Sequence, residues 1–319
     1  MEIKDEFGRS FKTLRVSLLN TCNLACVYCT CGNEDSKDNY LNGRDNSLST
    51  SELLAIIKVL HNQLNLTTVR FTGGEPLLYK QLPELIGGVA KLGIEDLKLT
   101  TNGVLLERLA PELKLAGLKS VNVSLDAIDP ESFFKMSRRH DAERTIKGIR
   151  AAKACGIDVK INSVIMKGNN DNQIIPLLEF AFSENITIRF LEIMSMGHLF
   201  GKTDEYFFSQ KEILEKVSKY HTFKPLERTT SATANYWRTL EGNVFGIVAN
   251  ESQPFCSDCN RLRLDAHGNI YGCLSSNFPV SLKNINIEAE VNTKLQEALA
   301  QKQSVKFIGS SLSMLHIGG

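Results

Sequence analysis

The sequence lacks an excess of charge of either sign, and it lacks a hydrophobic run long enough to cross a membrane. Its 37 Lys and Arg side chains stand against 36 Asp and Glu, so the formal charge is +1. This balance excludes a broad basic surface for nucleic acid or anionic lipid. No stretch approaches the roughly 18 apolar residues of a membrane span, and the first residues lack the apolar core of a signal peptide. We therefore expect a cytoplasmic protein that binds neither membrane nor nucleic acid and meets any anionic ligand with a local cluster of charge.

Low-complexity runs, short repeats and obvious linkers are also absent. The chain has 319 residues, 42% of them hydrophobic, so it can bury a large core without disulfides and should form one large domain with an appendage. It contains eight cysteines. In a cytoplasmic chain of this size they indicate thiolate metal ligands or catalytic groups.

Apolar segments alternate with helical patterns over the first 200 residues. Ser49 and Glu52 have capping-box spacing, and Gly93, Gly117 and Gly156 stand where helices should end. Six strand–helix units predict a parallel sheet with right-handed crossovers. The predicted strands are 13–19, 67–72, 96–101, 120–126, 158–165 and 186–192, and the predicted helices are 49–63, 82–92, 105–116, the 129–153 region and 173–184.

The alternation stops near residue 200. Segments 235–249 and 260–274 have the pattern of antiparallel strands, the second turning at His267-Gly268-Asn269, and an amphipathic helix is expected around 287–301. We therefore predict an α/β fold. An incomplete (β/α)₆ TIM-type barrel would span residues 1–200, and a C-terminal α+β appendage would span residues 201–319.

Polar side chains occupy every second position of the predicted strands, whereas parallel strands covered by helices are usually apolar throughout. A barrel interior of arginine and lysine cannot pack dry, because unpaired buried charge is too costly. We expect an open barrel that holds water or an anionic ligand. A polar face simply exposed to solvent is the alternative, which the helical crossovers disfavour. The polar positions are Arg15 and Ser17, Arg70 and Thr72, Lys98 and Thr100, Asn122, Ser124 and Asp126, Lys160 and Asn162, and Arg189.

Six of the cysteines fall into two sets of three. Cys22, Cys26 and Cys29 follow the first strand with Cys-x₃-Cys-x₂-Cys spacing, so three thiolates on a short loop could ligate three corners of a [4Fe-4S] cluster. The second set, spaced Cys-x₂-Cys-x₁₃-Cys, is also one ligand short of closure. Its members are Cys256, Cys259 and Cys273.

On spacing alone, the second set favours a structural zinc site with His267 or Cys31 as the fourth ligand. A zinc-dependent nucleobase deaminase is excluded, because that chemistry needs His-x-Glu. None of the six histidines is followed by x-Glu.

Motifs around the first cysteine set make the chain similar to a known superfamily. Tyr28 precedes the third cysteine, and Gly73-Gly74-Glu75-Pro76 follows the second strand; both features resemble the radical S-adenosylmethionine (SAM) superfamily. Further segments narrow the resemblance to the GTP 3′,8-cyclase family, which acts first in molybdenum-cofactor biosynthesis. These segments are Phe7-Gly8-Arg9, Leu14-Arg15, Thr100-Thr101-Asn102-Gly103, Asn122-Val123-Ser124-Leu125-Asp126, Lys160-Ile161-Asn162, Arg189-Phe190-Leu191-Glu192, Asn260-Arg261-Leu262-Arg263 and Ile317-Gly318-Gly319.

The resemblance implies two [4Fe-4S] clusters, one on each cysteine set, and SAM as a cofactor. The first cluster would bind SAM through its open iron, and the second would bind the guanine of the substrate GTP. SAM would be contacted by Tyr28, Gly74, Ser124 and Met194. GTP would be held by Arg15, Arg70, Thr100, Lys160, Arg261, Leu262 and Arg263, several of them through the triphosphate.

The resemblance also implies a reaction and partners. A radical made from SAM would take hydrogen from C3′ of GTP, and C3′ would then bond to C8 of guanine. The partners would be a flavodoxin- or ferredoxin-type electron donor and cyclic pyranopterin monophosphate synthase, which receives the product; a homodimer is left open. Gly318-Gly319 would reach into the active site.

Two departures from the family pattern are Tyr79, where arginine is common, and Ala232-Thr233-Ala234, where Gly-Pro-Ala is common. Two other functions compete with the cyclase. One is a radical SAM peptide maturase with an auxiliary cluster, although such enzymes usually carry more C-terminal cysteines. The other is a non-enzymatic zinc-binding regulator.

Overall fold

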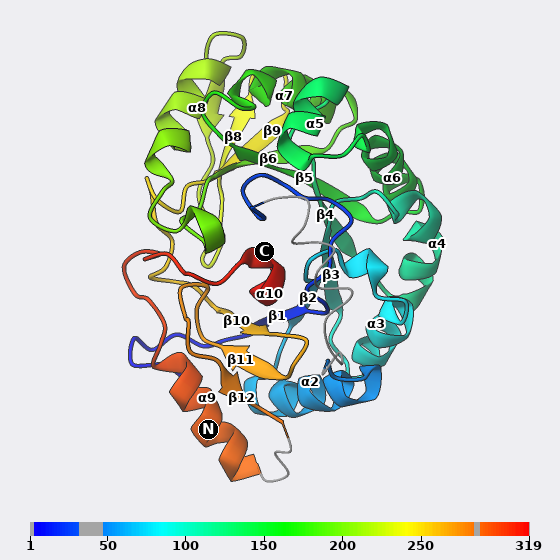
Figure 1. The fold of residues 1–319 in the computed structure, drawn as a ribbon, viewed down its shortest axis with the longest axis vertical. Coiled ribbons are helices and arrows are strands. Elements are labelled where there is room, and N and C mark those ends of the chain that lie inside the picture. Colours follow the sequence, from blue (N-terminus) through cyan, green and yellow to red (C-terminus); the bar gives the residue numbers. More distant parts are fainter. Residues whose placement is uncertain (1–2, 32–46, 284–287, 319) are drawn as a thin grey trace.

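A computed structural model describes residues 3–31, 47–283 and 288–318. Within these ranges the strands form one 12-stranded sheet in the order β12-β11-β10-β1-β2-β3-β4-β5-β6-β9-β8-β7. The eight strands from β10 to β9 pair in parallel and curl into an open barrel (Figure 1). The first six are β1 (Thr13–Ser17), β2 (Thr68–Thr72), β3 (Asp96–Thr101), β4 (Ser120–Ser124), β5 (Asp158–Ile165) and β6 (Thr187–Glu192).

The six predicted strands and their crossover helices are confirmed, with bounds that differ by a few residues at most. Ser49 caps the first of these helices through the predicted capping box with Glu52. The helices cover the outside of the barrel (Figure 1). They are α2 (Thr50–Leu64), α3 (Leu82–Ala90), α4 (Leu106–Ala116), α5 (Pro130–Ser137), α6 (Ala142–Ala154) and α7 (Ile174–Ser183).

The 129–153 region contains two helices, α5 and α6, and the chain bends between them. Arg138 ends α5 in the left-handed conformation, with φ of 55°. Its guanidinium donates hydrogen bonds to the carbonyl oxygens of Ala25 (3.0 Å) and Thr30 (3.1 Å) in the cysteine loop. The helix therefore ends where a tertiary contact requires it, which periodicity does not reveal.

The C-terminal strands form the predicted hairpins, but their inner strands extend the barrel. β10 (Arg261–Leu264) pairs in parallel with β1, and β9 (Val244–Val248) pairs in parallel with β6. The appendage therefore continues the sheet at both edges, and the boundary near residue 200 stays a prediction. The remaining elements are β7 (Phe223–Pro225), β8 (Asn235–Thr239), β11 (Asn269–Tyr271), β12 (Val280–Ser281), α8 (Gln210–Val217), α9 (Glu288–Leu299) and α10 (Met314–Ile317).

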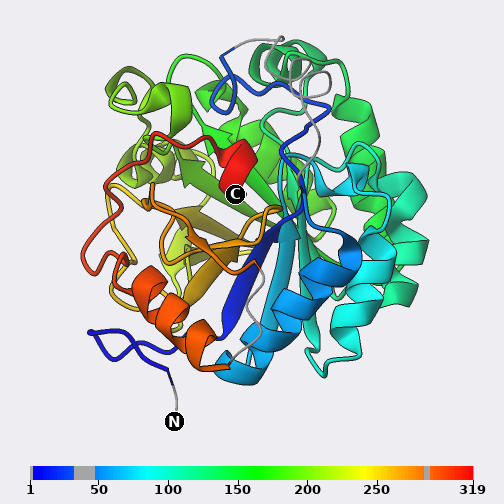
Figure 2. The ribbon, with the colours of Figure 1, turned by 60° about the horizontal axis from the view of Figure 1, so that its bottom comes forward.

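Side-chain alternation along the strands separates the core from the lumen. Leu14, Val16, Val69 and Phe71 are fully buried between sheet and helices, while the polar positions face inward. The short helix α10 lies within the ring of strands in Figure 1, and the turned view of Figure 2 shows this red helix at one end of the barrel. No helix among the described residues is long and apolar enough to cross a membrane.

Candidate active site

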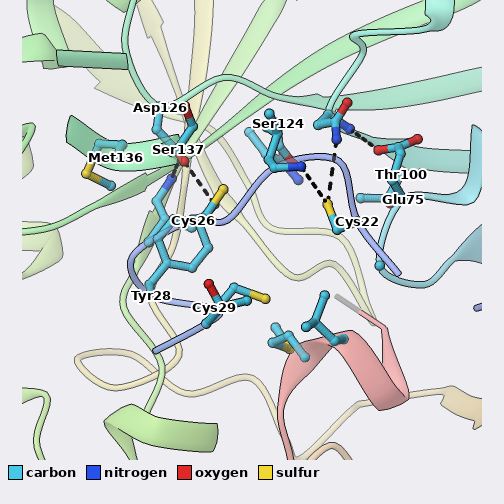
Figure 3. Close-up of a pocket in the computed structure, with 18 of the residues that line it drawn as sticks. Cys22, Cys26, Tyr28, Cys29, Glu75, Thr100, Ser124, Asp126, Met136 and Ser137 are labelled. Carbon is cyan, nitrogen blue, oxygen red and sulfur yellow. Dashed lines mark hydrogen bonds between the residues drawn. The ribbon is translucent and has the colours of Figure 1, made fainter. Parts of the chain in front are cut away.

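The loop after β1 brings Cys22, Cys26 and Cys29 to the carboxyl ends of the barrel strands, where enzymes of this architecture have their active sites. All three are free cysteines, and their sulfurs face a shared space (Figure 3). One cavity is lined by these three residues and by all four predicted SAM contacts, namely Tyr28, Gly74, Ser124 and Met194. Thr100, a predicted GTP contact, lines the same cavity, so the structure brings eight predicted site residues together.

These three thiols are buried away from cations. Burial, together with the nearby Glu75 carboxylate, raises the pKa of Cys22 to about 12. Burial likewise raises the pKa of Cys29 to about 11 and the pKa of Cys26 well above its usual range. Thiolates here would need positive charge from a bound metal, so three soft sulfur donors with no protein counter-ion fit an iron–sulfur cluster.

Glu75 joins the Gly-Gly-Glu-Pro segment to the end of β3. Its carboxylate accepts hydrogen bonds from Thr101 Oγ1 (2.6 Å), from the Asn102 backbone N–H (2.7 Å) and from the Leu77 N–H (2.9 Å). Asn102 Nδ2 in turn donates to Asn23 Oδ1 (2.7 Å) and approaches Cys22 Sγ at 3.8 Å. Two motifs distant in sequence therefore fix the start of the cysteine loop.

Asp126 orients Tyr28. The Tyr28 hydroxyl donates to Asp126 Oδ2 at 2.9 Å, and the Val164 N–H donates to Asp126 Oδ1 at 2.8 Å. Burial raises the pKa of Asp126 to about 6. Glu75, Asn102 and Asp126 line the cavity but were not among the predicted site residues, although all three lie inside motifs that the sequence displays.

Gly74 is required by backbone packing. A Cβ at this position would lie 2.2 Å from the carbonyl oxygen of Thr21, inside the cysteine loop. The sequence argument assigned this glycine to the approach of SAM. The structure adds that any side chain would separate the Gly-Gly-Glu-Pro segment from the loop.

Four arginines gather around one region of the lumen. Arg15 pairs in register with Arg70 on one side and with Arg263 on the other. Burial first, and then the charges of Arg263, Arg70 and Arg261, lower the pKa of Arg15 well below its usual range. Burial also lowers the pKa values of Arg70 and Arg263 to about 10. Among the described residues none of the four forms an ion pair with a carboxylate, so the cluster favours an anion.

The other predicted GTP contacts take different positions. Thr100 lies beside Arg70, whose Nη1 is 3.4 Å from Thr100 Oγ1. Lys160 is exposed, but its ammonium lies 5.9 Å from the ring centre of Tyr236 on β8, across the lumen face. Leu262 is fully buried in the core, so only its backbone could meet a ligand. Lys98, which was not assigned to GTP, is paired with Asp96 at 2.6 Å.

The C-terminal tail, residues 313–318, links the cysteine loop to the arginines. Ser313 Oγ donates to the carbonyl of Cys29 at 3.2 Å. Arg263 Nη1 donates to the carbonyls of Ile317, at 3.2 Å, and Gly318. Gly318 has φ of +70°, and a Cβ there would meet Thr72 Cγ2 at 2.4 Å. Gly318 is thus inside the barrel as predicted, while Gly319 lies outside the described residues.

The second cysteine set lies beside the arginine cluster. Burial alone would raise the pKa of Cys259, but Arg261 and Lys302 outweigh it and lower that pKa to about 6. Burial and the charges of Cys273 and Cys259 raise the pKa of Cys256 to about 11. The Cys256 thiol is therefore close enough to the other two sulfurs to interact with them electrostatically. A set that pairs one stabilised thiolate with two further sulfurs suits soft metal ions.

No three His, Cys, Asp or Glu side chains in the described ranges converge as ligands of one metal ion do. Each thiolate of a [4Fe-4S] cluster binds a different iron, so a cluster does not require that convergence.

Comparison with known proteins identifies the class and then the family. The sequence model described as "Radical SAM superfamily" matches residues 16–181, and the one described as "Molybdenum Cofactor Synthesis C" matches residues 186–308. GTP 3′,8-cyclase of Synechocystis sp. is 33% identical over 317 residues, which cover 99% of this chain and 94% of the relative. GTP 3′,8-cyclase of Staphylococcus aureus is 37% identical over 306 residues, which cover 95% of this chain and 88% of the relative. The chain is a radical SAM enzyme and belongs to the GTP 3′,8-cyclase family.

Solved structures agree on the fold. Streptococcus suis SuiB bound to S-adenosylmethionine is similar with a TM-score of 0.65 at 17% identity, covering 89% of this chain and 66% of that one. SuiB bound to its precursor peptide SuiA has a TM-score of 0.67, and the match covers 92% of this chain and 67% of that one. At this identity the likeness confirms the partial barrel and carries no argument for a peptide substrate. The family assignment confirms the predicted SAM and iron–sulfur chemistry and leaves neither the peptide maturase nor the zinc regulator with support.

Proposed function

We propose that this chain converts GTP into (8S)-3′,8-cyclo-7,8-dihydroguanosine 5′-triphosphate, the first step of molybdenum-cofactor biosynthesis. The observation that carries the proposal is the group of Arg15, Arg70, Arg261 and Arg263 in the lumen, free of carboxylate partners in the described chain. A triphosphate supplies the several negative charges that such a group requires.

The first cysteine set would hold a [4Fe-4S] cluster, with SAM in the adjoining cavity. When bound, the cluster supplies the electron that cleaves SAM into methionine and a 5′-deoxyadenosyl radical. The protein's part is to hold the reactants and to exclude water and other hydrogen donors. Tyr28, fixed by Asp126, would contact the adenine, and Gly74, Ser124 and Met194 would position the rest of SAM.

GTP would bind between the two cysteine sets. Its phosphates would be held by Arg15, Arg70, Lys160 and Arg263. Further contacts to GTP would come from Thr100 and from the other residues of the Arg261–Arg263 segment. The tail supports this placement, since it contacts the loop of Cys29 and the guanidinium of Arg263. In the reaction, the radical would take a hydrogen atom from C3′ of the ribose, giving 5′-deoxyadenosine, and C3′ would then bond to C8 of guanine. One further electron from the donor and one proton would complete the 7,8-dihydro ring.

The second cysteine set would hold another [4Fe-4S] cluster, whose open coordination position would bind the guanine. Electrons would come from a flavodoxin- or ferredoxin-type donor in the cytoplasm. Cyclic pyranopterin monophosphate synthase would take the product. The homodimer stays an open prediction.

The test is an anaerobic turnover assay with SAM, a reductant and GTP, followed by product identification. Consumption of GTP with 5′-deoxyadenosine and the 3′,8-cyclised nucleotide supports the proposal. The matched control replaces GTP with ATP, which carries the same triphosphate on another base. Cleavage of SAM without loss of GTP would remove GTP as the substrate.

A further inference from the structure

Lys302 is a buried lysine that none of the assignments above uses. It follows α9, and only 6% of it is exposed. The charged groups that act on its ammonium most strongly are Cys259, Cys273, Arg261 and Arg9, none of them a carboxylate. A buried cation without a carboxylate partner needs another reason to be where it is.

The ammonium contacts one sulfur of the second cysteine set and two carbonyl oxygens of residues close to that set in sequence. Lys302 Nζ lies 2.7 Å from the carbonyl oxygen of Gly272, 2.9 Å from that of Arg261 and 3.6 Å from Cys259 Sγ. Gly272 immediately precedes Cys273. The ammonium also lies 4.8 Å from the ring centre of the buried Phe11, a cation–π contact. One side chain therefore contacts a sulfur of the set and fixes the backbone beside another.

A lysine just beyond a helix ordinarily bonds that helix's own last carbonyls. Here the acceptors belong to β10, the residue after β11 and a cysteine instead. The approach is possible because Gly272 has no side chain: a Cβ there would lie 1.9 Å from the carbonyl oxygen of Ala298 in α9. The glycine allows the end of α9 to pack against the cysteine turn.

Arg9 contacts the backbone of Cys256, the remaining cysteine of the second set. Its Nη1 donates to the carbonyl of Cys256 at 2.6 Å and to that of Gln303, next to Lys302, at 2.9 Å. Arg9 is itself buried and paired with Asp5 at 2.6 Å. This gives a structural reason for the Phe7-Gly8-Arg9 segment, to which the sequence argument assigned no role.

We propose that Lys302 is a positioning residue of the second cluster site, holding the Cys259 sulfur and the Arg261 and Gly272 carbonyls in place, with Arg9 acting in the same way at Cys256. This role rests on the proposed function, because that function places a cluster on these cysteines. A cation beside a cluster also favours its reduced, more negative state, so Lys302 should affect the spectrum and potential of the cluster as well as its retention.

The test is Lys302→Met, prepared anaerobically with iron and sulfide and compared with the wild type. The wild type should hold about eight irons per chain, as two [4Fe-4S] clusters require. In the variant we expect about four, with the SAM-dependent signal of the first cluster retained and the GTP-dependent change in the paramagnetic resonance spectrum lost. Lys302→Gln, which keeps an N–H donor, should retain more second-site iron than Lys302→Met.

The matched control is Lys294→Met, on the helix α9 that precedes Lys302, where the lysine is partly exposed and pairs with Glu297. It should match the wild type. About eight irons in Lys302→Met, with an unchanged GTP-dependent spectrum and potential, would overturn the role of Lys302. Loss of both clusters in both Lys302 variants would show a general folding defect and also overturn it. About four irons in the wild type would instead remove the second cluster from the proposed function.

Discussion

Four arginines share one side of the lumen because strand register places them there. Arg15, Arg70 and Arg263 occupy equivalent positions on three adjacent parallel strands, and Arg261 precedes Arg263 by two residues on the same face. Repulsion between like charges this close destabilises an empty barrel. A bound polyanion makes the electrostatic energy of the cluster favourable. Their contribution to folding is therefore unfavourable, and their contribution to binding is favourable.

Replacing Arg263 with alanine should separate GTP binding from SAM cleavage. A hydrogen bond to a charged group contributes about 1.5–3 kcal/mol, so the Kd for GTP should rise by at least about tenfold. Arg263 bonds the C-terminal tail rather than the cysteine loop after β1 itself, so 5′-deoxyadenosine should still form without GTP. Calorimetric titration with GTP measures the first effect, and product analysis measures the second. Arg144→Ala, at an exposed ion pair on α6, is the control, and an unchanged Kd in Arg263→Ala would remove that arginine from the site.

Glu75 should make the stability of the protein depend on pH. Burial raises its pKa from 4.5 to about 7 despite three hydrogen bonds. The folded state therefore binds this proton more tightly than the unfolded state. The stabilisation is complete below pH 4.5 and is lost as the pH rises through 7, by about 3 kcal/mol in total.

The measurement is the free energy of unfolding in denaturant, under anaerobic conditions at pH 5 and pH 8, for the wild type and Glu75→Gln. The wild type should lose more stability than the variant between the two values. An equal change in the free energy of unfolding of the two proteins between pH 5 and pH 8 would show that Glu75 does not titrate in this range.

At the scale of the elements, the contact between α9 and the turn at Cys273 depends on one residue without a side chain. Gly272→Ala would place a Cβ 1.9 Å from the Ala298 carbonyl, and backbone cannot yield as a flexible side chain can. We expect a loss of about 1–3 kcal/mol in stability, the range for overpacking a tight contact, together with loss of iron from the second site. Denaturant unfolding and iron analysis measure both.

Gly87→Ala is the matched control. Gly87 lies inside α3, and the nearest atom to an added Cβ is the Ala116 carbonyl oxygen at 4.0 Å. Since alanine favours a helix by about 1 kcal/mol over glycine, this variant should be as stable as the wild type or more so. If Gly272→Ala behaves like Gly87→Ala, the packing of α9 on the turn is not what positions this site.

The elements of the barrel were predictable because their pattern is local. Alternation with period two gave the six strands and the inward face of Arg15 and Arg70, and capping at Ser49 gave the first helix. What could not be predicted depends on distant contacts. Arg138 ends α5 by bonding the cysteine loop, and Lys302 reaches β10. Neither contact leaves a periodic signal, so neither residue was recognised.

At the scale of the whole molecule, the C-terminal third supplies both edges of the barrel. β10 pairs with β1 through residues 261–264, and β9 pairs with β6 through residues 245–248. Without them, β1 and β6 would each expose a row of unpaired backbone groups, which is unfavourable for folding and promotes aggregation. Residues 1–200 and 201–319 therefore share one sheet and one lumen.

A fragment of residues 1–200 should consequently fail to fold cooperatively, even though it contains the cysteine loop and all six strand–helix units. We expect low solubility and a weak near-ultraviolet dichroism signal for the fragment alone, because its two open edges and the lumen face have no partners. Co-expression with residues 201–319 is the control, and it should restore a soluble complex, since β9 and β10 can pair in trans. Sharp, two-state unfolding of the isolated fragment would mean that the six-stranded unit is stable on its own. The arginines of β10 would then be an addition to a finished domain, whereas the shared register of Arg15 and Arg263 indicates that one sheet brings both halves of the proposed GTP site together.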